Sequence, residues 1–144
     1  MTAAVEAAPP TPGDLMSPGQ RLRLVLVLGS LIAIGPLTID MYLPALPDIA
    51  RDLHTTSAAV QLTLTGTLAG LAVGQLLIGP LSDAVGRRAP LLAGVALHIV
   101  ASVLCVVAPT ITTVGVLRLL QGLGVAAASV VATAVVRDLF DGAA

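Results

Sequence analysis

Two ionisable side chains interrupt apolar stretches of this 144-residue chain, Asp40 in the first stretch and Arg118 in the last. A charge held near the centre of a bilayer costs about 2.5–3.5 kcal/mol on insertion scales, and such residues usually have a function. A neighbouring arginine favours the ionised form of a carboxyl group, whereas removal from water favours the neutral form. A carboxyl group under both influences can take up a proton in one conformation and release it in another. Proton exchange is therefore the chemistry that we expect of Asp40, with Arg118 as its partner.

The two residues are expected at the same depth in a membrane. Asp40 lies six residues before Leu46, where the first apolar stretch ends, and Arg118 lies six residues after Thr112, where the last one begins. At 1.5 Å per helical residue, each is about 9 Å inside its stretch. The two stretches run in opposite directions, so the side chains either pair or face a common aqueous cavity. A static ion pair, or side chains that reach the membrane interface, is the structural alternative, and the sequence leaves it open.

Other polar residues accompany this pair. Tyr42 follows Asp40 by two positions and is expected either at the membrane interface or facing a cavity. Gln121 follows Arg118 by about one helical turn, and it is expected to bond between helices or to line the same pathway. His98 has no acidic neighbour one turn away, so we expect a neutral histidine bonded to a neighbouring helix rather than a proton relay.

The chain as a whole has the composition of a membrane protein. It is 56% hydrophobic and 10% charged, with a formal net charge of −1, which argues against a soluble domain and against nucleic-acid binding. The single Cys105 excludes an internal disulfide and a cysteine-cluster metal site. No nucleophile–base pair or phosphate-binding loop is present, so neither an enzyme, nor a metal site, nor a cofactor is expected.

Four apolar segments, about 22–46, 57–81, 89–108 and 112–136, each approach the ~20 residues that a membrane-spanning helix needs. They lack the alternation of barrel strands, so the sequence predicts an all-α membrane protein with four transmembrane helices. Residues 1–20 are rich in proline, alanine and glycine and are expected to form a disordered cytoplasmic tail. Small residues form one face of span two and one face of span four, which predicts close helix packing. These residues are Gly66, Gly70 and Gly74 in span two, and Gly122, Ala126, Ser129 and Thr133 in span four.

The arginines predict the orientation of these spans. Those at the N-terminal end, in the loop after the second span and after the fourth span fall on one side: Arg21, Arg23, Arg87, Arg88 and Arg137. The other side carries only Arg51, whose charge is diluted by Asp48 and Asp52. Positively charged loops stay inside, so the N-terminus is expected in the cytoplasm and the protein in a plasma (bacterial inner) membrane.

The loop between spans two and three is the densest polar cluster of the chain: Gly79-Pro80-Leu81-Ser82-Asp83-Ala84-Val85-Gly86-Arg87-Arg88. It resembles the signature of the major facilitator superfamily at that place, Gly-x-Leu-x-Asp-x-x-Gly-Arg-Arg/Lys. The run Arg118-Leu119-Leu120-Gln121-Gly122-Leu123-Gly124 resembles the fourth-span motif of its proton-driven drug antiporters. Two further runs, 39–47 and 136–140, are similar to the bicyclomycin and chloramphenicol resistance (Bcr/CflA) branch.

The resemblance implies a cytoplasmic gating cluster. In the family, the aspartate and the first arginine of the signature form a charge network with an acid at the inner end of span four, which here implies Asp83, Arg87 and Asp138. The network acts as a latch that is closed in one conformation and broken in another. Gly79 is expected to permit close helix approach and Gly86 the turn, with Arg88 beside them. Many members have a basic residue after the aspartate, where this chain has Ala84, so the latch is expected to be weaker or to depend on the two arginines.

The resemblance also implies the fold and the function. Members have twelve helices in two six-helix halves, so the four spans would belong to the N-terminal half, and the remaining helices would be partners in the same transporter. The expected function is proton-coupled export of small drug-like compounds by alternating access, driven by the proton gradient without a cofactor. Asp40, Arg118, Tyr42 and Gln121 are the expected pathway residues. The sequence leaves open whether the chain is a fragment or a truncated product, and whether it is instead a small four-helix oligomeric exporter or a non-transporting membrane scaffold.

Overall fold

The computed structural model describes residues 11–140, and this part of the chain is helical, without strands. Its elements are α1 (Pro18–Asp40), a short 3-10 helix η1 (Leu43–Ala45), α2 (Leu46–Asp52), α3 (Ser57–Val85), α4 (Arg88–Val106) and α5 (Ile111–Phe140). Four segments are long and apolar enough to cross a membrane: Pro18–Asp52, Ser57–Val85, Arg88–Val106 and Ile111–Phe140. The predicted all-α fold with four membrane-spanning helices is confirmed.

The first helix starts earlier than the sequence analysis expects. Residues 1–10 of the expected tail lie outside the described residues, but α1 already begins at Pro18. The Ser17 side chain accepts a hydrogen bond from the Gln20 amide (3.3 Å), and the Gln20 side chain accepts one from the Ser17 amide (2.9 Å). This capping box, followed by proline at the first helical position, fixes the start of the helix. The expected tail of residues 1–20 therefore does not extend to residue 20.

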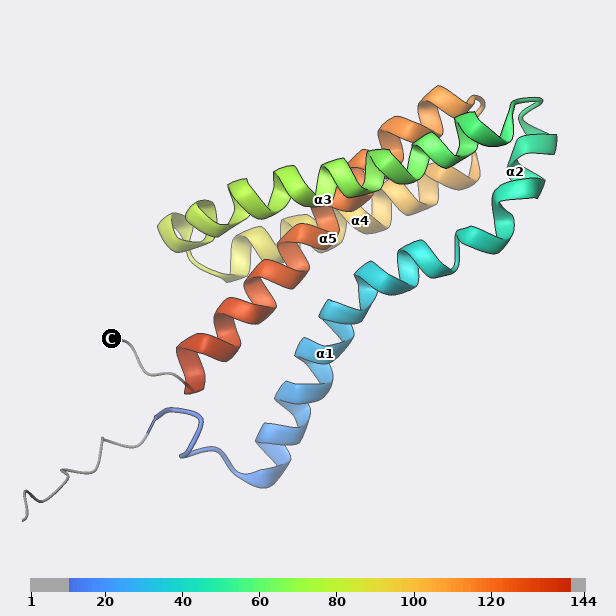
Figure 1. The fold of residues 1–144 in the computed structure, drawn as a ribbon. Coiled ribbons are helices and arrows are strands. Elements are labelled where there is room, and N and C mark those ends of the chain that lie inside the picture. The colour runs from blue at the N-terminus through green and yellow to red at the C-terminus, as the bar shows by residue number, and fades with distance from the viewer. Residues whose placement is uncertain (1–10, 141–144) are drawn as a thin grey trace, which may run out of the picture.

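The first span, expected over about 22–46, is divided into several helical pieces near its end. Pro36 lies inside α1, which continues to Asp40 and changes direction in its C-terminal half (Figure 1). The chain then forms η1 and α2, in which Pro44 and Pro47 are the second residues. Proline lacks an amide hydrogen and is therefore tolerated where a helix begins. The two prolines thus divide the end of the span into short pieces.

The core of the molecule follows α5, which packs against both α3 and α4, while α1 diverges from them (Figure 1). In the most apolar 18-residue stretch of α5, 56% of the residues are buried, whereas 6% are buried in the corresponding stretch of the first span. A β-carbon on Gly70 would collide with the Leu119 carbonyl oxygen, and one on Gly122 with the Thr67 carbonyl oxygen. The predicted close packing through small residues is confirmed, because only glycine lets these backbones approach so closely.

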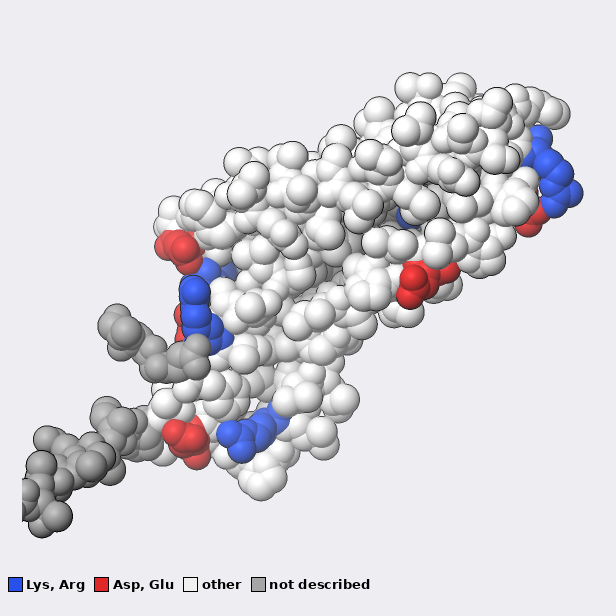
Figure 2. Space-filling model, viewed as in Figure 1, with Lys and Arg blue, Asp and Glu red and all other residues white. Residues whose placement is uncertain are grey.

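Charge is distributed as a membrane-spanning bundle requires. On the face shown in Figure 2, most charged side chains gather at the two ends of the molecule, and the long surface between them is largely uncharged. One end holds the turn between α3 and α4 together with the C-terminal end of α5, and we call it the connector end. The other end holds η1 and α2. The two candidate sites lie at the connector end and in the interior near η1.

Candidate functional site

The connector turns between α3 and α4 within two residues. Gly86 has φ +89°, a left-handed conformation in which a side chain is strained, so the expectation that glycine is needed for this turn is met. Gly79 differs from its expectation. A β-carbon there would have no atom within 4 Å, because Gly79 faces an open groove rather than a neighbouring helix among residues 11–140.

Arg87 joins three side chains from two helices. Its Nη1 atom lies 2.6 Å from Asp83 Oδ1 and donates to Ser82 Oγ at 2.8 Å, while its Nε atom donates to Asp138 Oδ2 at 3.2 Å. The structure thus brings together Asp83, Arg87 and Asp138, the three residues that the resemblance groups. Ser82 is a fourth member that the sequence analysis did not single out; it is almost fully buried and donates to the Gly79 carbonyl oxygen.

The charges of this cluster are partly in water. Burial acts to lower the pKa of Arg87, but the carboxylates of Asp138 and Asp83 outweigh it and raise the pKa, so the guanidinium stays charged. The side chains of Asp83 and Asp138 are 60% and 50% exposed. Solvent weakens exposed ion pairs, so this cluster holds α3 to α5 with little energy. Arg88 starts α4, is exposed, and has no ion pair among residues 11–140.

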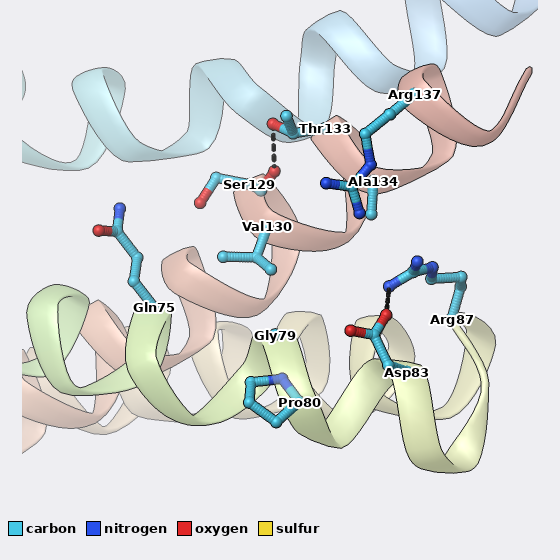
Figure 3. A pocket seen from close by; sticks show the side chains of 10 residues that line it. All are labelled: Gln75, Gly79, Pro80, Asp83, Arg87, Ser129, Val130, Thr133, Ala134 and Arg137. Atoms are coloured by element: carbon cyan, nitrogen blue, oxygen red, sulfur yellow. Dashed lines mark hydrogen bonds and ion pairs between the residues drawn. The ribbon is translucent and has the colours of Figure 1, made fainter. Parts of the chain in front are cut away.

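A groove of about 510 Å³ opens beside this cluster, between α3 and α5 (Figure 3). Asp83 and Arg87 point toward one another at one end of it, and Gln75 lies at the other end (Figure 3). Ser129 and Thr133, which the sequence analysis placed on the small-residue face of α5, line the groove with Arg137. The close-packed part of that face therefore ends before Ser129.

Arg118 forms the second site, in the interior. It is only 8% exposed, and its Cζ atom lies 3.4 Å from the centroid of the Tyr42 ring. Its Nη1 atom donates to the Thr38 carbonyl oxygen at 3.4 Å. The Tyr42 hydroxyl lies 2.8 Å from Thr63 Oγ1, a hydrogen bond that also ties η1 to α3. Of the two positions left open for Tyr42, the structure shows the one inside the molecule.

Asp40 does not meet Arg118. It is exposed, and no ion pair joins the two residues in the described part of the chain. Arg118 contacts residues 38 and 42, so the expected depth agrees with the structure. The direction differs, because a helix turns about 100° per residue and Asp40 lies about 200° around α1 from Thr38. The residue that faces α5 at this level is Tyr42, one turn after Thr38.

Polar side chains extend from Arg118 along a cavity of about 470 Å³ between α1, α4 and α5. Gln121 Nε2 donates to Ser102 Oγ at 2.7 Å. His98 Nδ1 lies 3.3 Å from the Gln121 carbonyl oxygen, and its Nε2 lies 3.5 Å from Thr38 Oγ1. The expectation of a histidine bonded to neighbouring helices is confirmed. Thr38 and Ser102 were missed, although each is one helical turn from a residue that the sequence analysis names.

The remaining chemistry of the described residues is limited. No group of three or more histidine, cysteine or acidic side chains that could hold a metal ion occurs among residues 11–140. Cys105 is half-buried, and its Sγ atom lies 4.0 Å from Gln121 Oε1. The interactions that the structure shows in the two sites are ion pairs, hydrogen bonds and the contact of Arg118 with the Tyr42 ring.

The chain is similar to several membrane transporters. It is 50% identical over 123 residues to the uncharacterized MFS-type transporter YdgK of Bacillus subtilis. It is 34% identical over 122 residues to multidrug resistance protein D of Escherichia coli. To a chloramphenicol resistance protein of Pseudomonas aeruginosa, it is 42% identical over 118 residues. These matches cover 85%, 85% and 82% of this chain, but only 31%, 31% and 28% of the relatives.

A family model also matches most of the chain. The model of the Major Facilitator Superfamily matches residues 26–144, which include the four apolar helices almost entirely and the whole connector. Its members are transporters rather than enzymes, and the four helices described above form part of their fold. This multi-pass membrane chain therefore belongs to the Major Facilitator Superfamily.

Proposed function

We propose that this chain belongs to a proton-coupled exporter of small drug-like compounds, of the bicyclomycin and chloramphenicol resistance (Bcr/CflA) branch, in the plasma membrane. The names of two relatives, multidrug resistance protein D and chloramphenicol resistance protein, support this class of cargo. Because the chain spans about a third of its relatives, transport belongs to the whole protein, which would add the remaining helices of a twelve-helix fold. Its family also favours this architecture over a four-helix oligomeric exporter or a scaffold.

The observation that carries the proposal is the buried Arg118 beside a cavity of about 470 Å³. A charge in the interior of an apolar bundle is costly, and it is kept where it serves a pathway for ions or substrates. The cavity combines apolar side chains of α1 with the polar groups of Tyr42 and Gln121. This mixture suits a small ligand with an apolar body and a few polar groups.

Asp40 is proposed as the proton carrier, and the proton gradient as the driving force, without a cofactor. In the conformation described here its side chain is exposed at the surface of the described helices. Arg118 lies at the same level but on the other side of α1, so a rotation of this helix segment would bring the two together. Pro36 before Asp40 and the break after it interrupt the helical hydrogen bonds that would oppose such a rotation.

The cluster of Asp83, Arg87 and Asp138 is proposed as a cytoplasmic latch, with the N-terminus on the same side. The positive-inside bias of the arginines supports this orientation. Exposed ion pairs are weak and easily broken, which a latch that opens in each transport cycle requires. The groove beside it offers a place where one of the remaining helices could dock in the closed state.

Efflux measurements on the complete protein test the proposal. Asp40→Asn removes the titratable group at nearly constant size, so proton-driven efflux of chloramphenicol from cells should be lost while the protein still inserts into the membrane. Asp48→Asn is the matched control, because Asp48 is an exposed acid of α2 whose partner is Arg51. Normal efflux from the Asp40 variant would refute the coupling role, and loss of efflux in both variants would make the effect unspecific.

A further inference from the structure

Arg118 keeps hydrogen-bonding capacity that the described residues do not use. Its Nε atom is buried and has no acceptor within the part of the chain that the structure covers. A guanidinium group carries five N–H donors, of which the bond to the Thr38 carbonyl oxygen uses one. The Tyr42 ring covers one face of the group, leaving the donors along its edge. An edge of parallel N–H groups is the geometry that binds a carboxylate with two hydrogen bonds.

The positive charge of Arg118 is also unbalanced. Three ion pairs form among residues 11–140, and all of them involve Arg51 or Arg87. Asp40 faces away from Arg118. Asp52 and Arg118 both line a second cavity of about 190 Å³, but they form no ion pair. A buried charge without a partner is strongly unfavourable, so this position favours the approach of an anion.

Among residues 11–140, no acidic side chain lines the cavity of about 470 Å³ beside Arg118. Besides Arg118, its polar lining comes from Thr38, Tyr42, His98, Ser102 and Gln121. The rest of the lining is apolar and comes from α1 and the segment directly after it. Such a lining has no carboxylate to pair with an ammonium group, whereas it has both an apolar surface and a cationic anchor for an organic acid.

We propose that this cavity selects amphiphilic anions, in which a carboxylate binds the edge of Arg118 and an aromatic or aliphatic body lies against α1. The inference rests on the proposed function for the assumption that this cavity takes the transported compound. It concerns charged cargo, among which it favours organic acids over lipophilic cations of similar size, and it leaves neutral compounds such as chloramphenicol as cargo. Since the donors of Arg118 are fixed by Tyr42 and Thr38, the site is organised before the ligand arrives.

A pair of probes that differ only in charge tests this selection. The complete protein is purified into nanodiscs of zwitterionic lipid, and binding of 2-naphthoate and of 2-naphthylmethylammonium is measured by titration calorimetry at neutral pH. The wild-type protein should bind the acid about tenfold or more tightly than the amine, because a charge-assisted bond to arginine forms with only one of them. Equal binding, or tighter binding of the amine, would overturn the inference without any variant, including the case in which another helix already supplies a carboxylate to Arg118.

Variants then assign the selection to Arg118. Arg118→Gln should weaken binding of 2-naphthoate by about tenfold or more and leave the amine unchanged or tighter, while Arg118→Lys should retain part of the preference. Arg51→Gln is the matched control, because Arg51 is exposed on α2 and far from the cavity lining. If wild-type naphthoate binding persists in Arg118→Gln, Arg118 is not the anchor. Far-ultraviolet circular dichroism of each variant establishes that it is folded, and the wild-type comparison stands even if one is not.

The failure of this inference is distinguishable from failure of the proposed function. Efflux of chloramphenicol that depends on Asp40, together with equal binding of both probes, would leave the exporter standing and refute the anion selectivity. Preferred binding of the acid without proton-driven efflux of any compound would refute the exporter and leave the anion site.

Discussion

The guanidinium of Arg118 lies flat against the ring of Tyr42, with 3.4 Å between its Cζ atom and the ring centroid. The contact joins the core helix α5 to the segment that follows α1, where a break in the helix would otherwise leave the chain loosely held. A cation over an aromatic face is stabilised most where water is excluded, and both side chains are buried here. Tyr42 thus takes the place next to Arg118 that the sequence analysis gave to Asp40.

Replacing Tyr42 should separate the two interactions that the residue makes. Tyr42→Phe keeps the ring over Arg118 and loses the hydrogen bond to Thr63, at a cost of about 1 kcal/mol in the free energy of unfolding. Tyr42→Leu loses the cation–ring contact as well, at a further cost of about 1–2 kcal/mol. Unfolding by sodium dodecyl sulfate in mixed micelles measures both. Equal costs for the two variants would show that the ring contact contributes nothing.

A small substitution at the interface of α3 and α5 should be strongly destabilising. Gly70→Ala places a methyl group against the Leu119 backbone, and the helices must move apart at a cost of about 1–3 kcal/mol. Gly29→Ala in α1 is the matched control, because its new methyl group has no neighbour within 4 Å and alanine favours a helix. In detergent, the melting temperature of the Gly70 variant should therefore fall, whereas that of the Gly29 variant should stay the same or rise. A Gly70 variant as stable as the Gly29 variant would contradict the close packing.

The charges of the connector should act as a pair rather than singly. Arg87→Asp places an acid beside Asp83 and Asp138 and should abolish efflux, whereas the double variant Arg87→Asp with Asp138→Arg should recover part of it. Because these groups are exposed, the recovery should diminish at high ionic strength. The measurement is drug efflux in cells, with the salt dependence followed in proteoliposomes. Absence of recovery would indicate that Arg87 only marks the cytoplasmic side.

The turn before α1 should depend on its glycine. The Gly13 amide donates to the Leu139 carbonyl oxygen at 2.9 Å, and Arg21 lies 5.2 Å from the centroid of the Phe140 ring. A β-carbon on Gly13 would lie 2.5 Å from a Phe140 ring atom, so Gly13→Ala should detach residues 11–17 from the end of α5. Hydrogen exchange of this segment should then become faster.

Gly19→Ala provides the control for that experiment, because Gly19 is nearby in α1 and its β-carbon would meet nothing within 4 Å. Exchange of residues 11–17 should be unchanged in this variant. Equal exchange in both variants would show that the contact with Phe140 does not hold the turn.

The sequence allowed the number and type of the helices to be predicted because hydropathy and length are local properties. The close packing of α3 could also be predicted, since Gly66, Gly70 and Gly74 recur at the spacing of one helical face. The start of α1 at Pro18 was missed although its signal was present, because Ser17 and Gln20 have the spacing of a capping box. The proline, alanine and glycine content of residues 1–20 predicted a disordered tail, and the capping box within it was overlooked.

The partner of Arg118 could not be predicted from depth alone. The rise per residue placed Asp40 and Arg118 at one level, but which side of α1 faces α5 depends on packing between helices. Only the packing of α1 against α5 shows that Thr38 and Tyr42, rather than Asp40, lie on the side that faces Arg118. Ser82 was missed for a similar reason, because its bond to Arg87 crosses from α3 to the connector and leaves no periodic trace.

Proton release on addition of substrate tests the central proposal most directly. In everted membrane vesicles that hold an imposed pH gradient, acidic inside, an exporter that exchanges protons for drug dissipates the gradient when chloramphenicol is added, and a pH-sensitive dye reports the change. The account predicts dissipation with the wild-type protein and with Asp48→Asn, and none with Asp40→Asn at equal expression. Dissipation by the Asp40 variant at the wild-type rate would contradict the assignment of Asp40 as the proton carrier.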